Sequence, residues 1–177
     1  MFSKFQPTWQ VASIYELPPE ELRKKGIKVV LTDLDNTLIA WNNPDGTPQL
    51  REWLQKMEEA KIPVVDVSNN SFKRVARAVR SLGLPFVSRA MKPFARGLKI
   101  AVKRYGLKKH ETVLVGDQLM TDVASANNFG IRCILVKPLV KSDAWNTKIN
   151  RFLENIVKKR LLKENKLSTT WRHDLND

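Results

Sequence analysis

The chain has 177 residues, 42% of them hydrophobic, and a net charge of +13, which suits one basic globular domain with a sizeable core. No stretch approaches the roughly 18 to 20 apolar residues of a membrane span, and residues 1–10 lack the apolar core of a signal peptide. Cys133 is the only cysteine, which excludes an internal disulfide, and we expect a cytoplasmic protein that is not secreted.

The first half of the chain alternates between strand and helix patterns. Residues 27–32 and 62–67 are apolar runs that predict buried strands, and a helix between them opens at Thr47-Pro48, an N-cap followed by a proline. A second helix is predicted for residues 71–82, with basic residues opposite its apolar face. That apolar face consists of Phe72, Val75, Ala76, Val79 and Leu82.

The second half repeats this alternation. Strands are predicted for 85–88, 112–115 and 131–136, and helices for 93–105, 121–128 and 147–162. The last helix is expected to turn Ile149, Phe152, Leu153, Ile156 and Val157 inward. Such alternation predicts an α/β, Rossmann-like fold: a mostly parallel sheet with helices on both faces.

One domain is expected for residues 1–162, followed by a polar, flexible tail at 163–177. An aromatic arm precedes the first predicted strand. Its members are Phe2, Phe5, Trp9, Ile14 and Tyr15. We expect the arm to pack across the edge of the domain, with contact to a membrane interface as the alternative.

Polar side chains follow four of the predicted strands. They are Asp33, Asp35 and Thr37; Ser68 and Asn69; Lys92; and Asp117, with Asp122 five residues later. A parallel sheet brings the carboxyl ends of its strands to one edge, where ligands bind. Acids so placed can simply cap the next helix, but two of them two residues apart repel each other unless a cation lies between them. The pattern therefore favours a metal-assisted reaction.

These motifs, in this order, resemble the haloacid dehalogenase (HAD) superfamily of phosphatases. The ordered set is Asp-x-Asp-x-Thr, Ser-Asn, Lys and Gly-Asp-x-x-x-x-Asp, and it spans residues 33–122. The surrounding residues, including 31–41 and 150–154, are similar to the YqeG-type branch of the cap-poor subclass IIIA. Related members of that branch are phosphatidylglycerophosphate phosphatases, which suggests the same lipid substrate and a role in phospholipid metabolism here.

The resemblance implies an Mg²⁺-dependent phosphomonoester hydrolase. Asp33 would be the nucleophile that forms an aspartyl-phosphate, and Asp35 would protonate the leaving alcohol and then activate water. The implied metal ligands are Asp33, the main-chain carbonyl of Asp35, Asp117 and Asp122. The implied phosphate-binding residues are Ser68, Asn69, Lys92 and Thr37, and Thr37 is expected to orient the loop rather than to react.

The spacing of the motifs predicts a fold with a minimal cap or none. Only a loop and one helix fit between Asp35 and Ser68, and only a helix and a short strand fit between Ser68 and Lys92. An open site suits a substrate that brings its own bulk, such as a macromolecule or a lipid head group, although an oligomer partner could supply a cap.

Three functions remain open. The first is a lipid phosphatase bound peripherally to the inner face of a membrane through a basic surface, since residues 68–109 contain twelve Lys and Arg and no Asp or Glu. The second is a soluble phosphatase for a nucleic-acid end, a nucleotide or a sugar phosphate. The third is a non-catalytic basic module that binds RNA or protein, against which the complete set of motifs argues.

Overall fold

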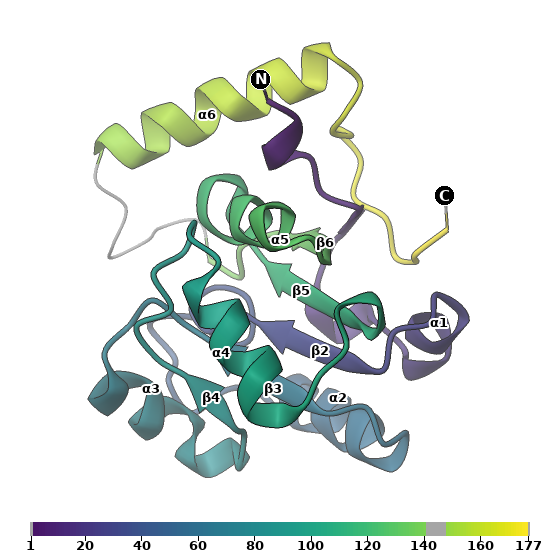
Figure 1. The fold of residues 1–177 in the computed structure, drawn as a ribbon, viewed down its shortest axis with the longest axis vertical. Helices are drawn as coiled ribbons and strands as arrows, with labels where there is room; N and C mark the ends of the chain where they lie inside the picture. Colours follow the sequence, from purple (N-terminus) through teal and green to yellow (C-terminus); the bar gives the residue numbers. More distant parts are fainter. Residues whose placement is uncertain (1, 141–147, 177) are drawn as a thin grey trace.

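The computed structural model describes residues 2–140 and 148–176, and its centre is a six-stranded parallel sheet (Figure 1). The strands are β1 (Trp9–Val11), β2 (Val29–Thr32), β3 (Val64–Val67), β4 (Phe86–Val87), β5 (Thr112–Gly116) and β6 (Arg132–Val136). They are arranged in the order β1-β6-β5-β2-β3-β4, and every neighbouring pair is parallel. The predicted α/β fold is confirmed.

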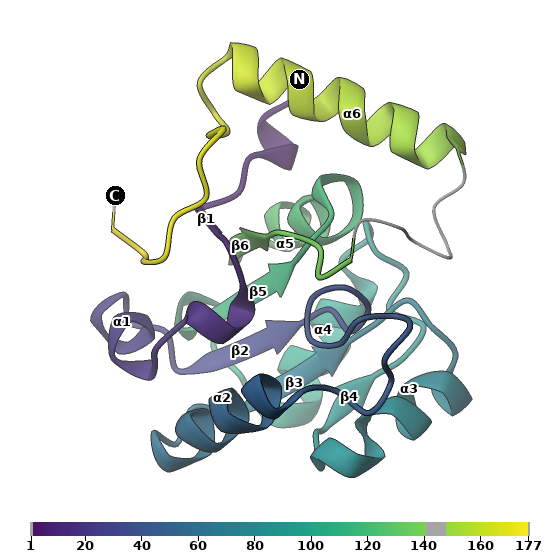
Figure 2. The ribbon, with the colours of Figure 1, turned by 180° about the vertical axis from the view of Figure 1, so that it is seen from behind.

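Helices cover both faces of the sheet, as Figures 1 and 2 show from opposite sides. They are α1 (Pro19–Lys24), α2 (Pro48–Glu59), α3 (Phe72–Val79), α4 (Arg96–Tyr105), α5 (Ala124–Phe129) and α6 (Lys148–Lys163). Side chains of α1, α2 and α3 join one apolar core, and side chains of α4, α5 and α6 join the other. The strands between the two cores are therefore buried on both faces, which explains their mostly apolar sequences, with Asp66 of β3 as an exception.

Local sequence signals set the helix starts that flank the site. The hydroxyl of Thr47 accepts a hydrogen bond from the N–H of Leu50, and Pro48 occupies the first turn of α2. The hydroxyl of Ser71 accepts from the N–H of Arg74 in the same way at the start of α3. The caps direct both helices back along the sheet from its carboxyl edge.

No separate domain is inserted between the strands that carry the motifs. The segment between β2 and β3 holds a loop and α2, and the segment between β3 and β4 holds α3 and a short 3-10 turn, Arg80–Leu82. The carboxyl edge of the central strands is therefore open. Among the described helices, none combines the length and the apolar content that crossing a membrane requires.

Two predicted helix faces are wrong in part. Phe72, expected inside, is 63% exposed at the start of α3, where it contacts Phe86 of the edge strand at a ring separation of 5.3 Å. On α6 the expected inward residues Phe152, Leu153 and Ile156 are exposed. The helix buries Val157, as expected, together with Leu161, because it packs by a narrow stripe beside α5 rather than directly on the sheet. The side chain of Ile149 lies outside the described part of the chain.

The aromatic arm packs on the domain as expected, and it also forms the edge strand β1, which sequence analysis did not predict. The tail differs from the flexible segment that was expected. Leu167 and Leu175 are buried, and the main chain of Arg172 accepts a hydrogen bond from Ala12 at 2.8 Å. Two leucines within a polar segment are enough to anchor it, and main-chain pairing needs no particular side chains.

Candidate active site

The loop that carries the first motif starts where β2 ends. The N–H of Asp33 donates to the carbonyl of Val115 at 2.9 Å, so the first residue of the loop is still held by β5. Three residues later Asn36 adopts a φ of 60°, a left-handed conformation that asparagine tolerates, and its N–H donates to the carbonyl of Ile39 at 2.6 Å. This sharp turn presents Asp33 and Asp35 at the carboxyl edge of the sheet.

Lys92 lies at the centre of the site, between two carboxylates. Its buried ammonium group donates to Oδ1 of Asp33 and to Oδ1 of Asp122, each at 2.6 Å. Burial lowers the pKa of Lys92, but Asp122 and Asp33 more than offset this effect, and the pKa is raised above its ordinary value. The lysine therefore remains a fixed positive charge next to Asp33.

The pKa of Asp33 is also raised, but here burial is the largest cause of the increase. Burial raises the pKa of Asp33 to about 7, the Lys92 ammonium opposes this shift, and the nearby Asp122 adds to it. A cation bound beside Asp33 would favour its ionised form.

Three carboxylates can hold such a cation. Asp33, Asp117 and Asp122 each offer an oxygen, and these oxygens all lie within 4.8 Å of one another. An all-oxygen, acidic group of this size fits a hard divalent ion such as Mg²⁺. The hydroxyl of Thr37 donates to Oδ1 of Asp117 at 3.2 Å, so Thr37 orients a member of this group. The side chain of Asp35 is not a member, and a contribution from its main-chain carbonyl stays a prediction.

Asp122 is placed by a π-helical turn, Leu119–Val123, a conformation frequent at functional sites. Its Oδ2 accepts from the N–H of Gln118 at 3.2 Å. A Cβ atom on Gly116 would lie 2.3 Å from Cγ of Asp122, a distance that ordinary packing does not allow. Gly116 is therefore required for Asp122 to reach Lys92.

Asp35 is held on the other side of the site by two residues to which sequence analysis assigned no role. Its Oδ1 accepts from Arg74 at 3.0 Å, and its Oδ2 accepts from the side chain of Asn70 at 2.7 Å. Asn70 also donates to the hydroxyl of Ser68 at 3.1 Å, which links the first and second motifs. Two sequence positions could have indicated these roles: Asn70 follows β3 at the carboxyl edge of the sheet, and Arg74 lies in the first turn of α3.

Asn69 was expected to bind phosphate, but its side chain has another contact. Its Oδ1 accepts from the N–H of Lys92 and its Nδ2 donates to the carbonyl of Lys92. These bonds position Lys92, and the binding of a phosphoryl group by Ser68, Asn69 and Lys92 stays a prediction.

Glu154 of α6 is a further residue that the motifs did not reveal. Its carboxylate accepts from the N–H groups of Leu119 and Met120, at 2.6 Å and 3.1 Å. Burial raises the pKa of Glu154, and the two N–H donors oppose that shift. Glu154 thus joins α6 to the start of the turn that carries Asp122.

Comparison with known proteins identifies the family. The HAD-hydrolase-like family model matches residues 90–158. The protein named "Probable phosphatase YqeG" from Bacillus subtilis (strain 168) is 42% identical over 153 residues, which are 86% of this chain and 89% of that protein. The chain belongs to the YqeG branch of the HAD superfamily. It is therefore a phosphatase, and the predicted family and enzyme class are confirmed.

More distant similarities extend the comparison. Phosphatidylglycerophosphate phosphatase 1 of Arabidopsis thaliana is 27% identical over 133 residues, which are 70% of this chain but only 38% of that protein. A crystal structure of an uncharacterized protein from Listeria monocytogenes serotype 4b superimposes with a TM-score of 0.54 at 16% identity, covering 75% of this chain and 99% of that one. That likeness supports the fold alone.

Proposed function

We propose that this phosphatase hydrolyses a phosphomonoester with Asp33 as its nucleophile, and that its substrate is phosphatidylglycerophosphate. The observation that carries the first part is the contact of Lys92 with both Asp33 and Asp122 at the open carboxyl edge of the sheet. The similarity to phosphatidylglycerophosphate phosphatases of Arabidopsis thaliana and Chlamydomonas reinhardtii supports the second part.

The residues divide the reaction into two steps. A carboxylate oxygen of Asp33 attacks phosphorus, the bond from phosphorus to the alcohol oxygen breaks, and Asp35 gives its proton to that oxygen. Asp35 then takes a proton from water, the water oxygen attacks the aspartyl-phosphate, and inorganic phosphate leaves with Asp33 restored. Throughout, the Lys92 ammonium offsets the negative charge on the transferring group.

Mg²⁺ is the cofactor in this proposal. Asp33, Asp117 and Asp122 would hold it, together with the main-chain carbonyl of Asp35. When bound, the ion would neutralise charge on the nucleophile and on the phosphate, which lets one anion approach another.

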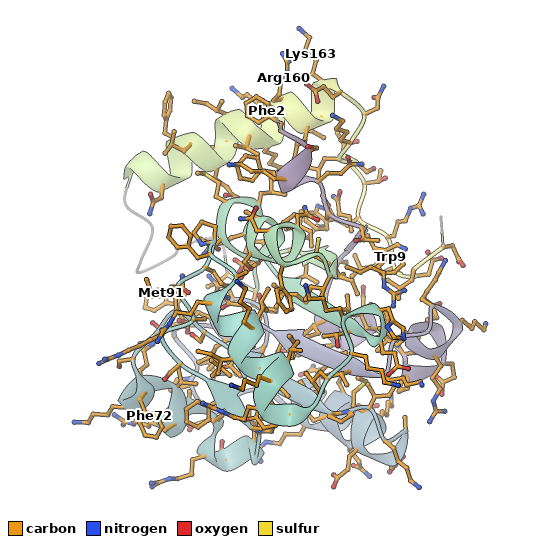
Figure 3. All side chains as sticks on the ribbon, in the orientation of Figure 1. Phe2, Trp9, Phe72, Met91, Arg160 and Lys163 are labelled. Atoms are coloured by element: carbon orange, nitrogen blue, oxygen red, sulfur yellow. The ribbon has the colours of Figure 1, made fainter. Side chains whose placement is uncertain are left out.

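The surface around the site supports a substrate in a membrane. Met91 and Phe94, on either side of Lys92 and Pro93, are 52% and 66% exposed. Figure 3 shows Phe72 and Met91 pointing outward on the left, the side toward which β2 and β5 run in Figure 1. Exposed basic side chains accompany them, namely Lys73, Arg77, Arg89 and Arg96. Apolar and basic side chains together favour peripheral binding to an anionic lipid surface.

The test compares phosphate release from phosphatidylglycerophosphate in vesicles with release from glycerol 3-phosphate, a 5′-nucleotide and a sugar phosphate. We expect the lipid to be the fastest substrate, and we expect EDTA to abolish turnover until Mg²⁺ is restored. Asp33→Asn should lower kcat by about a thousandfold or more. Faster turnover of a soluble ester would exclude the lipid assignment, and an active Asp33→Asn variant would exclude the nucleophile.

A second measurement addresses the surface. Replacing Phe72 and Phe94 together by serine should weaken co-flotation with anionic vesicles and slow hydrolysis of the lipid. The rate on glycerol 3-phosphate should stay within about twofold of the wild-type rate, because both rings are largely exposed to solvent. Equal co-flotation of both proteins would contradict a role for these rings in membrane binding.

A further inference from the structure

A cavity of about 470 Å³ lies beside Asp35, between the loop after β2 and helix α3. Figure 2 shows that loop in dark blue, passing near α3 before the chain enters α2. The loop supplies apolar and aromatic side chains, namely Leu34, Ile39, Trp41 and Pro44. The helix supplies three cationic side chains, namely Lys73, Arg74 and Arg77. The volume of the cavity is typical of sites for small organic ligands.

The charge of this cavity favours an anion. Asp35 is the only acid among its described lining residues, and it is paired with Arg74 at 3.0 Å. Lys73 and Arg77 add two more positive charges, and the stretch 68–109 around them contains no acid. A cationic helix face opposite an apolar wall suits a ligand that has both a carbon skeleton and a negative group.

The position of the cavity relative to the reacting groups limits what that ligand can be. Asp35 lines it, whereas Asp33 and Lys92 are not among its described lining residues. In the proposed reaction the phosphoryl group lies at Asp33 and Lys92, and the leaving alcohol lies at Asp35. The cavity is therefore on the side of the leaving alcohol.

We propose that this cavity binds the leaving group of the substrate, and that Arg77 and Lys73 bind a second anionic group carried by it. The inference rests on the proposed function, because it takes Asp35 as the residue that protonates the leaving oxygen. It makes the site selective for a phosphomonoester whose alcohol carries a further negative charge. In phosphatidylglycerophosphate that charge is the phosphodiester, one glycerol unit from the scissile bond.

Two water-soluble esters test this selectivity without a membrane. The deacylated head group of phosphatidylglycerophosphate carries the phosphodiester, and glycerol 3-phosphate has the same kind of phosphomonoester without it. We expect the wild type to have a kcat/KM at least about tenfold higher for the first ester, and Arg77→Ala to reduce that preference about tenfold, mainly through KM. The control is Arg80→Ala, which removes an equal charge close to α3 but outside the cavity, and should leave the preference intact.

Binding to the Asp33→Asn variant, measured by titration calorimetry, separates this inference from the proposed function. If the wild type hydrolyses neither ester but the variant binds the deacylated head group through Arg77, the proposed function fails and the anion site stands. If both esters are hydrolysed without preference, the function stands and this inference is overturned. Equal effects of Arg77→Ala and Arg80→Ala, or no binding at all, would also overturn it.

Discussion

Asn69 holds both main-chain polar groups of Lys92. Its Oδ1 accepts the Lys92 N–H at 2.7 Å, and its Nδ2 donates to the Lys92 carbonyl at 3.0 Å. This pair joins the end of β3 to the loop after β4. The ammonium group of Lys92 can contact Asp33 only if the main chain of Lys92 is held in this position.

Asn69→Ala removes both hydrogen bonds and leaves the ammonium group chemically unchanged. We expect kcat to fall about 10- to 100-fold, because the charge beside Asp33 is no longer fixed in position. Steady-state kinetics on a soluble phosphomonoester measures this change. Asn128→Ala is the matched control: Asn128 donates to the carbonyl of Pro93 in the same loop, but it is exposed, and its loss should change kcat less than about twofold. Equal effects of the two variants would contradict a specific role for Asn69.

Gly116→Ala should disturb the acidic group through one added methyl. The new Cβ would lie 2.3 Å from Cγ of Asp122, so the Asp122 carboxylate must shift from its present position. We expect the Mg²⁺ concentration for half-maximal rate to rise about 10- to 100-fold. Gly106→Ala is the control. Its added methyl would meet nothing within 4 Å, but residue 106 has a left-handed main-chain conformation that alanine disfavours. We therefore expect lower stability and an unchanged Mg²⁺ dependence. An unchanged Mg²⁺ dependence in Gly116→Ala would show that the turn can adapt.

Asp66 on β3 should make stability depend on pH. Its carboxyl group is fully buried, and neither oxygen has a hydrogen-bond partner among the described residues. Burial, and then the charge of Asp33, raise the pKa of Asp66 well above its ordinary value of 3.8. The folded chain therefore keeps a proton that the unfolded chain releases, and the stability contributed by Asp66 is complete below about pH 3.8 and is lost as the pH rises.

Asp66→Asn removes this titration while keeping the shape of the side chain. We expect the free energy of unfolding of the variant, relative to wild type, to increase between about pH 4 and pH 8, by roughly 1–3 kcal/mol. Urea denaturation at a series of pH values measures both curves. Two curves that run parallel over this range would mean that Asp66 has an ordinary pKa.

Leu175→Ala tests whether the tail is part of the core. Leu175 is only 1% exposed among residues of the arm and α1, and its N–H donates to Glu21 at 2.8 Å. Removing its side chain should cost about 2–4 kcal/mol of the free energy of unfolding. Leu153→Ala, at an exposed position on α6, should cost less than about 1 kcal/mol. A tail that is free in solution would give equally small values for both.

Much of the fold and of the site could be predicted because the central strands follow a simple physical rule. A parallel strand buried on both faces is mostly apolar, so a cluster of polar residues such as Asp33 and Asp35 marks its end, although Asp66 lies within β3. Strands that run in one direction then bring these ends together. This reasoning places Asp33, Lys92, Asp117 and Asp122 at one site, and the structure has Lys92 in contact with Asp33 and Asp122.

The remaining features depend on tertiary contacts that leave little trace in local sequence. The strand Trp9–Val11 is three residues long and forms because β6 offers it an edge. The contacts of Asn70 and Arg74 with Asp35 join residues 35 and 39 positions apart along the chain. Which residues of α6 face inward depends on what lies beneath the helix, and hydrophobic spacing alone placed Phe152, Leu153 and Ile156 inward although they are exposed.

The main chain of the tail continues the sheet past β1. Ala12 donates to Arg172 at 2.8 Å, Arg172 donates to Gln10 at 3.4 Å, and the side chain of Gln10 contacts Ser168. These bonds occupy hydrogen-bonding groups that an edge strand would otherwise offer to another polypeptide. A proteolytic cut before Ser168 would uncover them, and the shortened protein would then be prone to self-association and precipitation.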